Sequence, residues 1–296
     1  MEAEPPPAIL VPVRPTSDCR ANRTSRPRSG WSVVCALRGL VGLVRSAASA
    51  VSTALVMAVS TGSKPAGHDY RAIGPSRCGY LGSAMPDNAT SADQADSYAA
   101  LLDHLDLDRV VAFGFSAGGP AAIQLALRHP KRLFGLILGS SYLPGMAKPL
   151  PGFLRPAMRA AVGWERGWWL LKSLRPMLLA RIMGVPKRWD PSDDADFLAI
   201  RDALFPIGPK KLGVAFDALV SNEFPLEDVR VPTLLVHAAD DRLAPYEHVQ
   251  PAADRIPGAR LVTIAAGGHL FLQHAHEVRD ASASFIREVL PTPPAT

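Results

Sequence analysis

Gly114-Phe115-Ser116-Ala117-Gly118 joins a predicted strand to a predicted helix, and this junction is the most informative part of the sequence. Residues 109–115 are largely apolar, which is typical of a strand buried on both faces of a sheet. A helix is predicted from Ala117 to about His129, where Pro130 ends it. A strand, tight turn and helix are the setting in which G-x-S-x-G holds a nucleophilic serine, because small residues at 114 and 118 let strand and helix approach closely.

Strand and helix signals alternate along the chain from residue 69 onward. Further strands are predicted at Tyr70–Ile73, Leu133–Leu138, Thr233–His237 and Arg260–Ile264, and further helices at 91–105, 246–256 and 276–290. Ser91 and Gln94 form the predicted capping box of the first of these helices. Because strands separated by helices of this length build βαβ units, the sequence predicts an α/β fold with a mostly parallel sheet and helices on both faces.

Residues 142–225 interrupt this alternation. The segment contains four of the five tryptophans, several prolines and helical stretches, but few strand signals. It is predicted to be a helical cap inserted between two strands of the sheet. Residues 69–141 and 226–296 then form the core of the protein.

A serine hydroxyl becomes an effective nucleophile only beside a base, which a carboxylate must orient. Both occur downstream, each directly after a predicted strand: Asp241, with Asp240 as the rival acid, and then His269. The order nucleophile, acid, base is typical of one class of α/β enzymes. Ser116 is expected to project its hydroxyl at the carboxyl edge of the sheet, with the backbone amide of Ala117 facing a developing oxyanion.

From about residue 69 to 290 the chain resembles the α/β-hydrolase family. The resemblance rests on the turn at Ser116, the loop after Asp241, the Gly267-Gly268-His269 segment and the loop Ser76–Ser83. That loop corresponds to the family's D-x-x-G-x-G-x-S pattern, with serine in place of the aspartate and the second glycine displaced by one residue. The resemblance implies that Ser116 is the nucleophile, His269 the general base and Asp241 its orienting acid, since Asp241 stands four residues before Pro245.

Members of that family have an earlier strand that ends in His-Gly and supplies the second oxyanion donor. Its expected place is near residues 36–51, where no His-Gly occurs. Three interpretations of the atypical segment 1–68 stay open. In the first, Trp31–Leu37 is a divergent version of that strand, Arg38-Gly39 is the oxyanion loop and Leu40–Ala58 is a helix. In the second, the segment is a genuine extension of a hydrolase that lost its first strands. In the third, which its foreign composition favours, it is an out-of-frame or mispredicted start.

Residues 1–68 also account for the basic character of the chain. They hold eight basic and three acidic side chains, an excess equal to the formal net charge of +5 of the 296 residues. The balanced remainder does not indicate a nucleic-acid partner, and three cysteines form no even disulfide framework. The apolar stretch 31–60 leaves a membrane anchor or an export signal as an alternative, but Arg38 and Arg45 interrupt it, so a cytoplasmic location is expected.

The expected function is that of a serine hydrolase acting through an acyl-enzyme on a small or medium apolar ester, amide or related acyl substrate. The apolar, tryptophan-bearing residues of 164–178 suggest the apolar character of that substrate. The resemblance also admits carbon–carbon bond hydrolysis and perhydrolysis, whereas the family's epoxide and haloalkane hydrolases use aspartate as nucleophile. The alternative is a non-catalytic or defective hydrolase-like protein that lacks a complete oxyanion hole.

No cofactor and no metal are expected, because His274 and His276 have no neighbouring residues that complete a recognised ligand spacing. The expected partner is a small-molecule substrate, and the oligomeric state is left open. One further hypothesis concerns the basic stretch Arg155–Arg188, whose tryptophans suit contact with a membrane surface.

Overall fold

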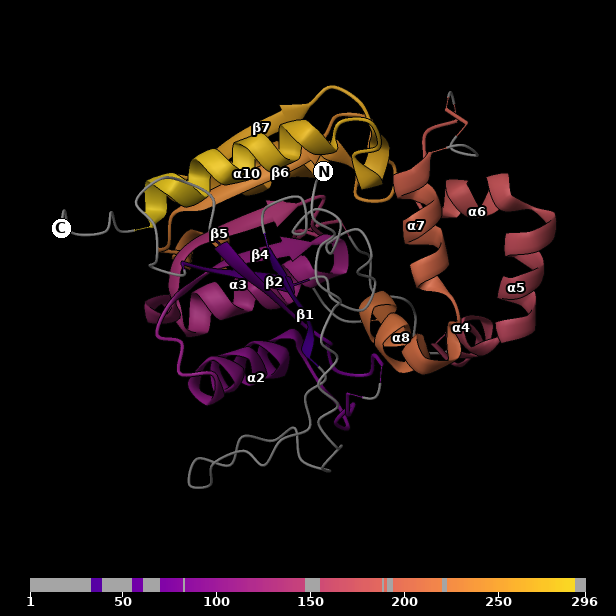
Figure 1. Cartoon of the computed structure of the whole chain (residues 1–296), viewed down its shortest axis with the longest axis horizontal. Coiled ribbons are helices and arrows are strands. Elements are labelled where there is room, and N and C mark those ends of the chain that lie inside the picture. The colour runs from indigo at the N-terminus through magenta and orange to yellow at the C-terminus, as the bar shows by residue number, and fades with distance from the viewer. Residues whose placement is uncertain are drawn as a thin grey trace, which may run out of the picture.

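The computed structural model describes residues 33–38, 55–60, 70–81, 83–146, 155–187, 189–190, 194–219 and 223–290. Its strands form one seven-stranded sheet in the order β1-β3-β2-β4-β5-β6-β7 (Figure 1). The strands are β1 (Val33–Arg38), β2 (Leu55–Ser60), β3 (Tyr70–Pro75), β4 (Val110–Phe115), β5 (Leu133–Gly139), β6 (Thr233–Ala238) and β7 (Arg260–Ile264).

The strands β4 to β7 pair in parallel, and helices cover both faces of the sheet. The helices around the sheet are α2 (Ser91–His104), α3 (Gly119–Arg128), α9 (Val249–Arg255) and α10 (Ala275–Val289). Apolar side chains of α2, α3 and α9 share one buried cluster, while those of α10 pack on the opposite face (Figure 1). The predicted α/β fold is confirmed, and β4 is buried along its whole length, as its apolar sequence predicts.

The capping box of α2 lies one residue earlier than the sequence pattern predicted. Thr90, not Ser91, is the N-cap: its Oγ1 accepts from the Asp93 amide at 3.2 Å, and the Asp93 carboxylate accepts from the Thr90 amide at 2.9 Å. Two overlapping residue pairs in this sequence, Thr90 with Asp93 and Ser91 with Gln94, have the spacing of a capping box. The structure uses the exposed pair Thr90 and Asp93, while Ser91 and Gln94 are both buried.

The first strands differ from the family-based expectation. The strand β1 overlaps the predicted strand Trp31–Leu37, but it pairs antiparallel with β3. The strand β2 inserts between β3 and β4 and is antiparallel to both. The predicted helix Leu40–Ala58 is therefore wrong for its last four residues, which belong to β2; its earlier part lies outside the described residues.

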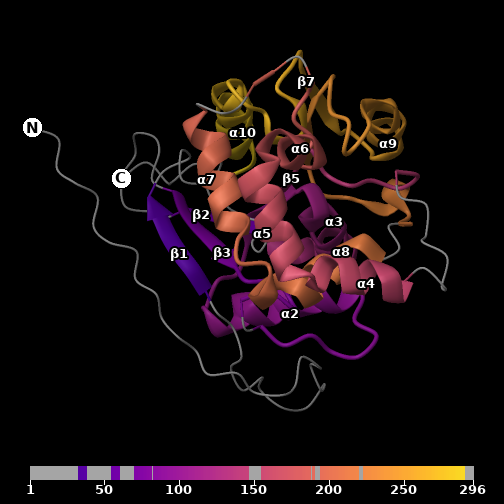
Figure 2. The same ribbon diagram turned by 90° about the vertical axis from the view of Figure 1, so that its right-hand side faces the viewer.

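Among the described residues between β5 and β6, within the segment predicted as a cap, there are five α-helices. They are α4 (Arg155–Gly163), α5 (Glu165–Leu174), α6 (Pro176–Ile182), α7 (Ala195–Leu204) and α8 (Lys211–Leu219). Figures 1 and 2 show them grouped beside one end of the sheet. They have a small apolar cluster of their own, in which Leu179, Phe197 and Ile200 are buried.

Within the described ranges, no helix combines the length and the apolar character needed to cross a membrane. Most of the stretch 31–60, on which the anchor hypothesis rests, lies outside those ranges.

Candidate active site

The turn at Ser116 connects β4 to α3 through the short 3-10 segment Ser116–Gly118. Ser116 has a φ of 49°, in the left-handed region that non-glycine residues rarely adopt. Gly114 allows the helix to sit close to the strand, because a Cβ there would lie 2.7 Å from the Ala122 Cβ. A Cβ at Gly119 would lie 2.6 Å from the Ser141 Cβ. The structure thus adds Gly119 to the glycines that the sequence pattern singled out.

We expect Gly114→Ala to lower the free energy of unfolding by about 1–3 kcal/mol, because the added methyl overpacks the contact between β4 and α3. Urea denaturation followed by circular dichroism measures this change. The matched control is Gly163→Ala, since a Cβ at Gly163 meets no atom within 4 Å. Equal effects of the two substitutions would contradict the close-approach explanation.

The structure brings the three predicted triad side chains together at the carboxyl edge of the sheet. The Ser116 Oγ lies 2.8 Å from the His269 Nε2, across 153 residues of sequence. The other ring nitrogen of His269, Nδ1, lies 2.8 Å from the Asp241 Oδ2. With the ring proton on Nδ1, where the carboxylate accepts it, Nε2 is free to accept the serine proton. This hydrogen-bonded chain can remove a proton from Ser116.

Asp241 is held as an ionised group by its surroundings. Its Oδ1 accepts from the amides of Leu243 at 2.8 Å and Ala244 at 2.9 Å. Burial raises the pKa of the Asp241 carboxyl, but the charge of His269 and hydrogen bonds from His237, His269 and Ala244 outweigh it and hold the pKa well below its usual range. A carboxylate fixed in this way can orient the imidazole and stabilise its protonated form.

His237 is a residue that the sequence analysis missed, since it was placed only at a strand end. Its Nε2 donates to the Ala244 carbonyl at 2.8 Å and lies 3.2 Å from the Asp241 Oδ2. It therefore contacts the same carboxylate oxygen as His269 does. A histidine four residues before the acid is the only sequence signal for this contact.

Asp240, the rival acid, lies in a different contact. Its Oδ1 accepts from the Gly268 amide at 2.9 Å, so its carboxylate holds the loop that carries His269. The two neighbouring aspartates thus point to separate partners. Only Asp241 has an oxygen on the imidazole.

The backbone carbonyl of Ala117 accepts a hydrogen bond from the side chain of Arg77. Ala117 lies in the 3-10 turn that begins the helix, where the first amides have no acceptor within the helix. Its carbonyl accepts from the Arg77 Nη1 at 3.2 Å. The same nitrogen donates to the Asp217 Oδ1 of α8 at 2.7 Å, and the hydroxyl of Tyr80 donates to the same carboxylate. Burial opposes the charge of Arg77, but the carboxylate of Asp217 raises the pKa of the guanidinium above its usual range.

We expect Asp217→Asn to lower the free energy of unfolding by about 3 kcal/mol, because it leaves the charge of Arg77 buried without its carboxylate. The Arg77 side chain is 1% exposed and that of Asp217 11%. Thermal unfolding of the two proteins measures the loss. Asp96→Asn is the control, since Asp96 (32% exposed) and its partners Arg128 (45%) and His129 (31%) are partly open to solvent, and it should cost less than about 1 kcal/mol. A loss no larger than that of the control would show that the buried pair contributes no stability.

Of the oxyanion loop Arg38-Gly39 in the first of the three interpretations, only Arg38 is described, and it does not lie at Ser116. Arg38 pairs with Arg71, at the amino end of β3. Because β3 and β4 are both antiparallel to β2, they run in the same direction, and Ser116 follows the carboxyl end of β4. Arg38 therefore lies at the opposite edge of the sheet. Of the first two strands, β2 approaches the serine turn, since its Leu55 pairs with Gly114.

Aromatic groups surround the serine–histidine pair. The Phe115 ring lies 5.6 Å and the Tyr142 ring 6.3 Å from the imidazole of His269. Burial raises the pKa of Tyr142 to about 12, so its hydroxyl stays protonated at neutral pH. The backbone amide of Tyr142 donates to the Ser116 carbonyl at 3.1 Å. The imidazole of His269 thus has two aromatic rings as neighbours, of which Phe115 belongs to the buried core and Tyr142 is partly exposed.

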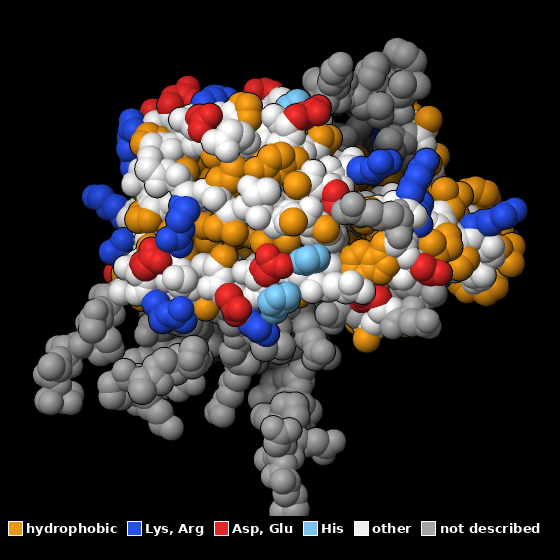
Figure 3. Space-filling view, turned by 90° about the horizontal axis from the view of Figure 1, so that it is seen from above, with side chains coloured by type: hydrophobic (Ala, Val, Ile, Leu, Met, Phe, Trp, Pro, Cys, Tyr) orange, Lys and Arg blue, Asp and Glu red, His pale blue; other side chains and the backbone are white. Residues whose placement is uncertain are grey.

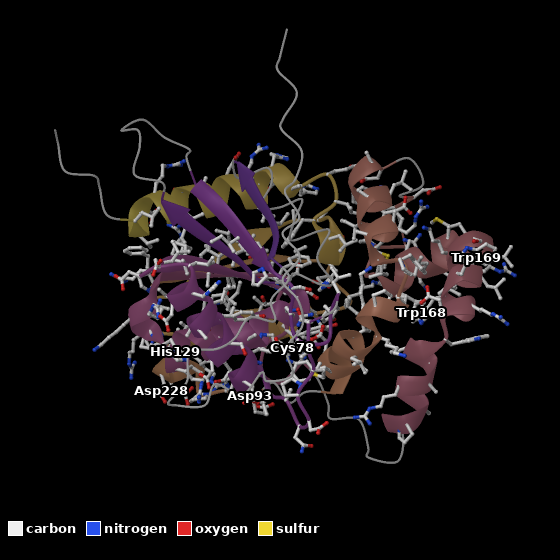
Figure 4. All side chains as sticks on the ribbon, turned by 60° about the horizontal axis from the view of Figure 1, so that its bottom comes forward. Cys78, Asp93, His129, Trp168, Trp169 and Asp228 are labelled. Atoms are coloured by element: carbon white, nitrogen blue, oxygen red, sulfur yellow. The ribbon has the colours of Figure 1, made fainter. Side chains whose placement is uncertain are left out.

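The tryptophans proposed as the source of that apolar character lie elsewhere. Trp164, at the start of α5, is 64% exposed, and Trp169, on the outer surface of α5, is 61% exposed. Figure 4 shows Trp169 at the outer margin of the molecule. The expectation that they favour an apolar substrate is not supported by their position. Among the described residues, no group of three or more His, Cys, Asp or Glu side chains is placed to hold a metal ion.

Comparisons with known proteins concern the fold and the family of the chain. The sequence model described as "alpha/beta hydrolase fold" matches residues 59–273. The putative carbamate hydrolase RutD of Caulobacter sp. (strain K31) is 30% identical over 221 residues, which cover 73% of this chain and 77% of that protein. The pimeloyl-(acyl-carrier protein) methyl ester esterase of Aromatoleum aromaticum is 31% identical over 60% of this chain and 74% of that protein. The structure of a thermophilic esterase from Thermogutta terrifontis superposes with a TM-score of 0.56 at 25% identity, covering 73% of this chain and 79% of that one.

Proposed function

The chain belongs to the α/β-hydrolase family and is an esterase-like hydrolase, and on that premise we propose that it works as a serine hydrolase through an acyl-enzyme. The observation that carries the proposal is the chain of two 2.8 Å contacts from Ser116 through His269 to Asp241. Distances of this size allow direct proton transfer between the groups.

In the proposed mechanism the Ser116 Oγ attacks an acyl carbonyl while the His269 Nε2 takes its proton. Asp241 stabilises the imidazolium, and the Ala117 amide donates a hydrogen bond to the carbonyl oxygen as it gains negative charge. His269 then returns the proton to the leaving group, and an acyl-serine remains. Water, deprotonated by His269, attacks the acyl-serine and releases the acid.

The substrate is proposed to be a small or medium apolar ester, amide or related acyl compound. The rings of Phe115 and Tyr142 beside His269 support this, since an apolar acyl group packs favourably against them. The names of two relatives, a carbamate hydrolase and a methyl ester esterase, make carbamates and esters the first compounds to compare.

The test is stopped-flow hydrolysis of p-nitrophenyl acetate, butyrate and octanoate, with mass spectrometry of the quenched protein. We expect a burst of about one p-nitrophenolate per protein followed by slower turnover, as an accumulating acyl-enzyme requires. The quenched protein should carry the acyl mass on the peptide that contains Ser116. An acyl group on another residue, with none on the peptide that contains Ser116, would rule out Ser116 as the acylated nucleophile.

The second candidate function is a hydrolase-like protein with a defective oxyanion hole. The position of Arg38 at the far edge of the sheet favours it, because that position removes the predicted second donor from the site. Loss of one oxyanion donor typically lowers kcat by about 10²–10³. A folded protein that binds apolar acyl compounds but gives neither burst nor turnover would support this candidate.

A further inference from the structure

The helices α5 and α6 expose a continuous set of large apolar side chains. Its members, the α5–α6 patch, each have more than a third of their surface exposed and are Trp164, Trp169, Leu170, Leu174, Met177, Leu178 and Ile182. Soluble proteins seldom expose so many large apolar groups side by side without a partner. Figure 3 shows apolar side chains at the end of the molecule that carries these helices.

The patch lies on defined helix faces. On α5, Leu170 and Leu174 are four residues apart and lie on one helix face, and Trp169 is exposed beside them, while Trp168 and Leu171 pack inward. On α6 the inward side chain is Leu179, which is fully buried. Both helices are therefore amphipathic: one face packs in the apolar cluster of the cap segment, and the other face is exposed in the part of the chain that the structure describes.

Basic groups accompany the apolar face. Arg166 lies on the same face of α5 as Leu170 and Leu174, and Arg175 connects α5 to α6; both are exposed. Neither has an ion pair with any described residue. The one acidic residue of this stretch, Glu165, is turned inward, where its carboxylate accepts from the amides of Ile207 and Gly208. Beside the exposed apolar side chains, Arg166 and Arg175 are thus basic groups unpaired among the described residues, whereas Lys172 of α5 is paired with Asp202 of α7.

We propose that the α5–α6 patch binds the surface of an anionic lipid bilayer. Tryptophan and leucine insert at the level of the headgroups, while arginine stays beside the lipid phosphates, which is the composition that interfacial helices require. A second copy of the chain fits the patch less well, because a symmetric contact would bring the arginines of both copies together. The segment that follows the patch reaches the candidate site: the carbonyl of Gly184, two residues after α6, lies 3.5 Å from the His269 amide.

The test is flotation of the whole chain with lipid vesicles. Vesicles of phosphatidylglycerol and phosphatidylcholine in equal parts should carry the protein upward, and vesicles of phosphatidylcholine alone should carry much less. The double variant Trp169→Ser, Leu174→Ser should bind roughly tenfold more weakly or worse, because it removes two large apolar anchors. Arg166→Glu with Arg175→Glu should weaken binding to the anionic vesicles in particular.

Matched controls separate the patch from general effects. Leu212→Ser removes an exposed leucine of α8, and Arg287→Gln removes an exposed arginine of α10; both should float like the unchanged protein. Thermal unfolding checks that each variant is folded. The basic segment 1–68 can itself attract anionic vesicles, so binding that persists in the Trp169→Ser, Leu174→Ser variant overturns the proposal. A protein that does not float, or one that forms dimers which this variant abolishes without any flotation, overturns it as well.

Discussion

Ser116→Ala should abolish labelling by a fluorophosphonate and lower kcat for a p-nitrophenyl ester by about 10⁶-fold, the size of loss typical of a nucleophilic serine. The reason is the position of its hydroxyl, 2.8 Å from the His269 Nε2. Labelling is followed by in-gel fluorescence, and turnover by release of p-nitrophenolate.

The control for this substitution is Ser173→Ala, which removes the hydroxyl of an exposed serine on α5 and should change neither readout. Unchanged labelling in Ser116→Ala would contradict the proposed nucleophile. Absence of labelling in the unchanged, folded protein would instead favour the defective hydrolase, because the triad would then be assembled but not reactive.

Asp241→Asn should lower kcat by about 10⁴-fold while leaving the fold intact, because an amide in this position favours the wrong tautomer of His269. The neighbouring Asp240→Asn is the sharpest available control. Its side chain holds the Gly268 amide and not the imidazole, so it should lower kcat by about tenfold at most. Steady-state kinetics of the two variants, with circular dichroism of each, measures the difference.

Equal losses in the two variants would mean that the loop position, and not the carboxylate on Nδ1, controls activity. A large loss confined to Asp240→Asn would assign the acid role to that residue. Only the predicted order, with Asp241 far more sensitive, fits the two hydrogen bonds that the aspartates make.

The serine turn and the parallel strands could be predicted because their determinants are local. The run 110–115 is apolar at nearly every position, and small residues flank Ser116 directly. Asp241 and His269 follow predicted strands, and the carboxyl ends of parallel strands meet at one edge of the sheet. The proximity of Asp241 and His269 to Ser116 therefore follows from the parallel arrangement of the strands that precede them.

The contacts between distant segments could not be predicted in this way. Arg77 meets Asp217 across 140 residues, and nothing in the composition of α8 marks Asp217 as the partner. The apolar character of α5 and α6 could be read from the sequence, but not that Trp168 and Leu171 pack inward while Trp169 is exposed. Composition says that a helix has an apolar face, while only packing decides whether that face meets a substrate, a core or solvent. The strand β2 was not predicted from the sequence, and its antiparallel pairing with β3 and β4 is again a contact between distant segments.

The wide separation of Ser116 and His269 along the chain has a consequence for synthesis in the cell. A ribosome releases the serine turn 153 residues before the base that activates it, and Asp241 only 28 residues before that base. Under the proposed mechanism, the emerging polypeptide therefore carries an unactivated serine until His269 has been added and the strands β6 and β7 have placed Asp241 and His269 beside it.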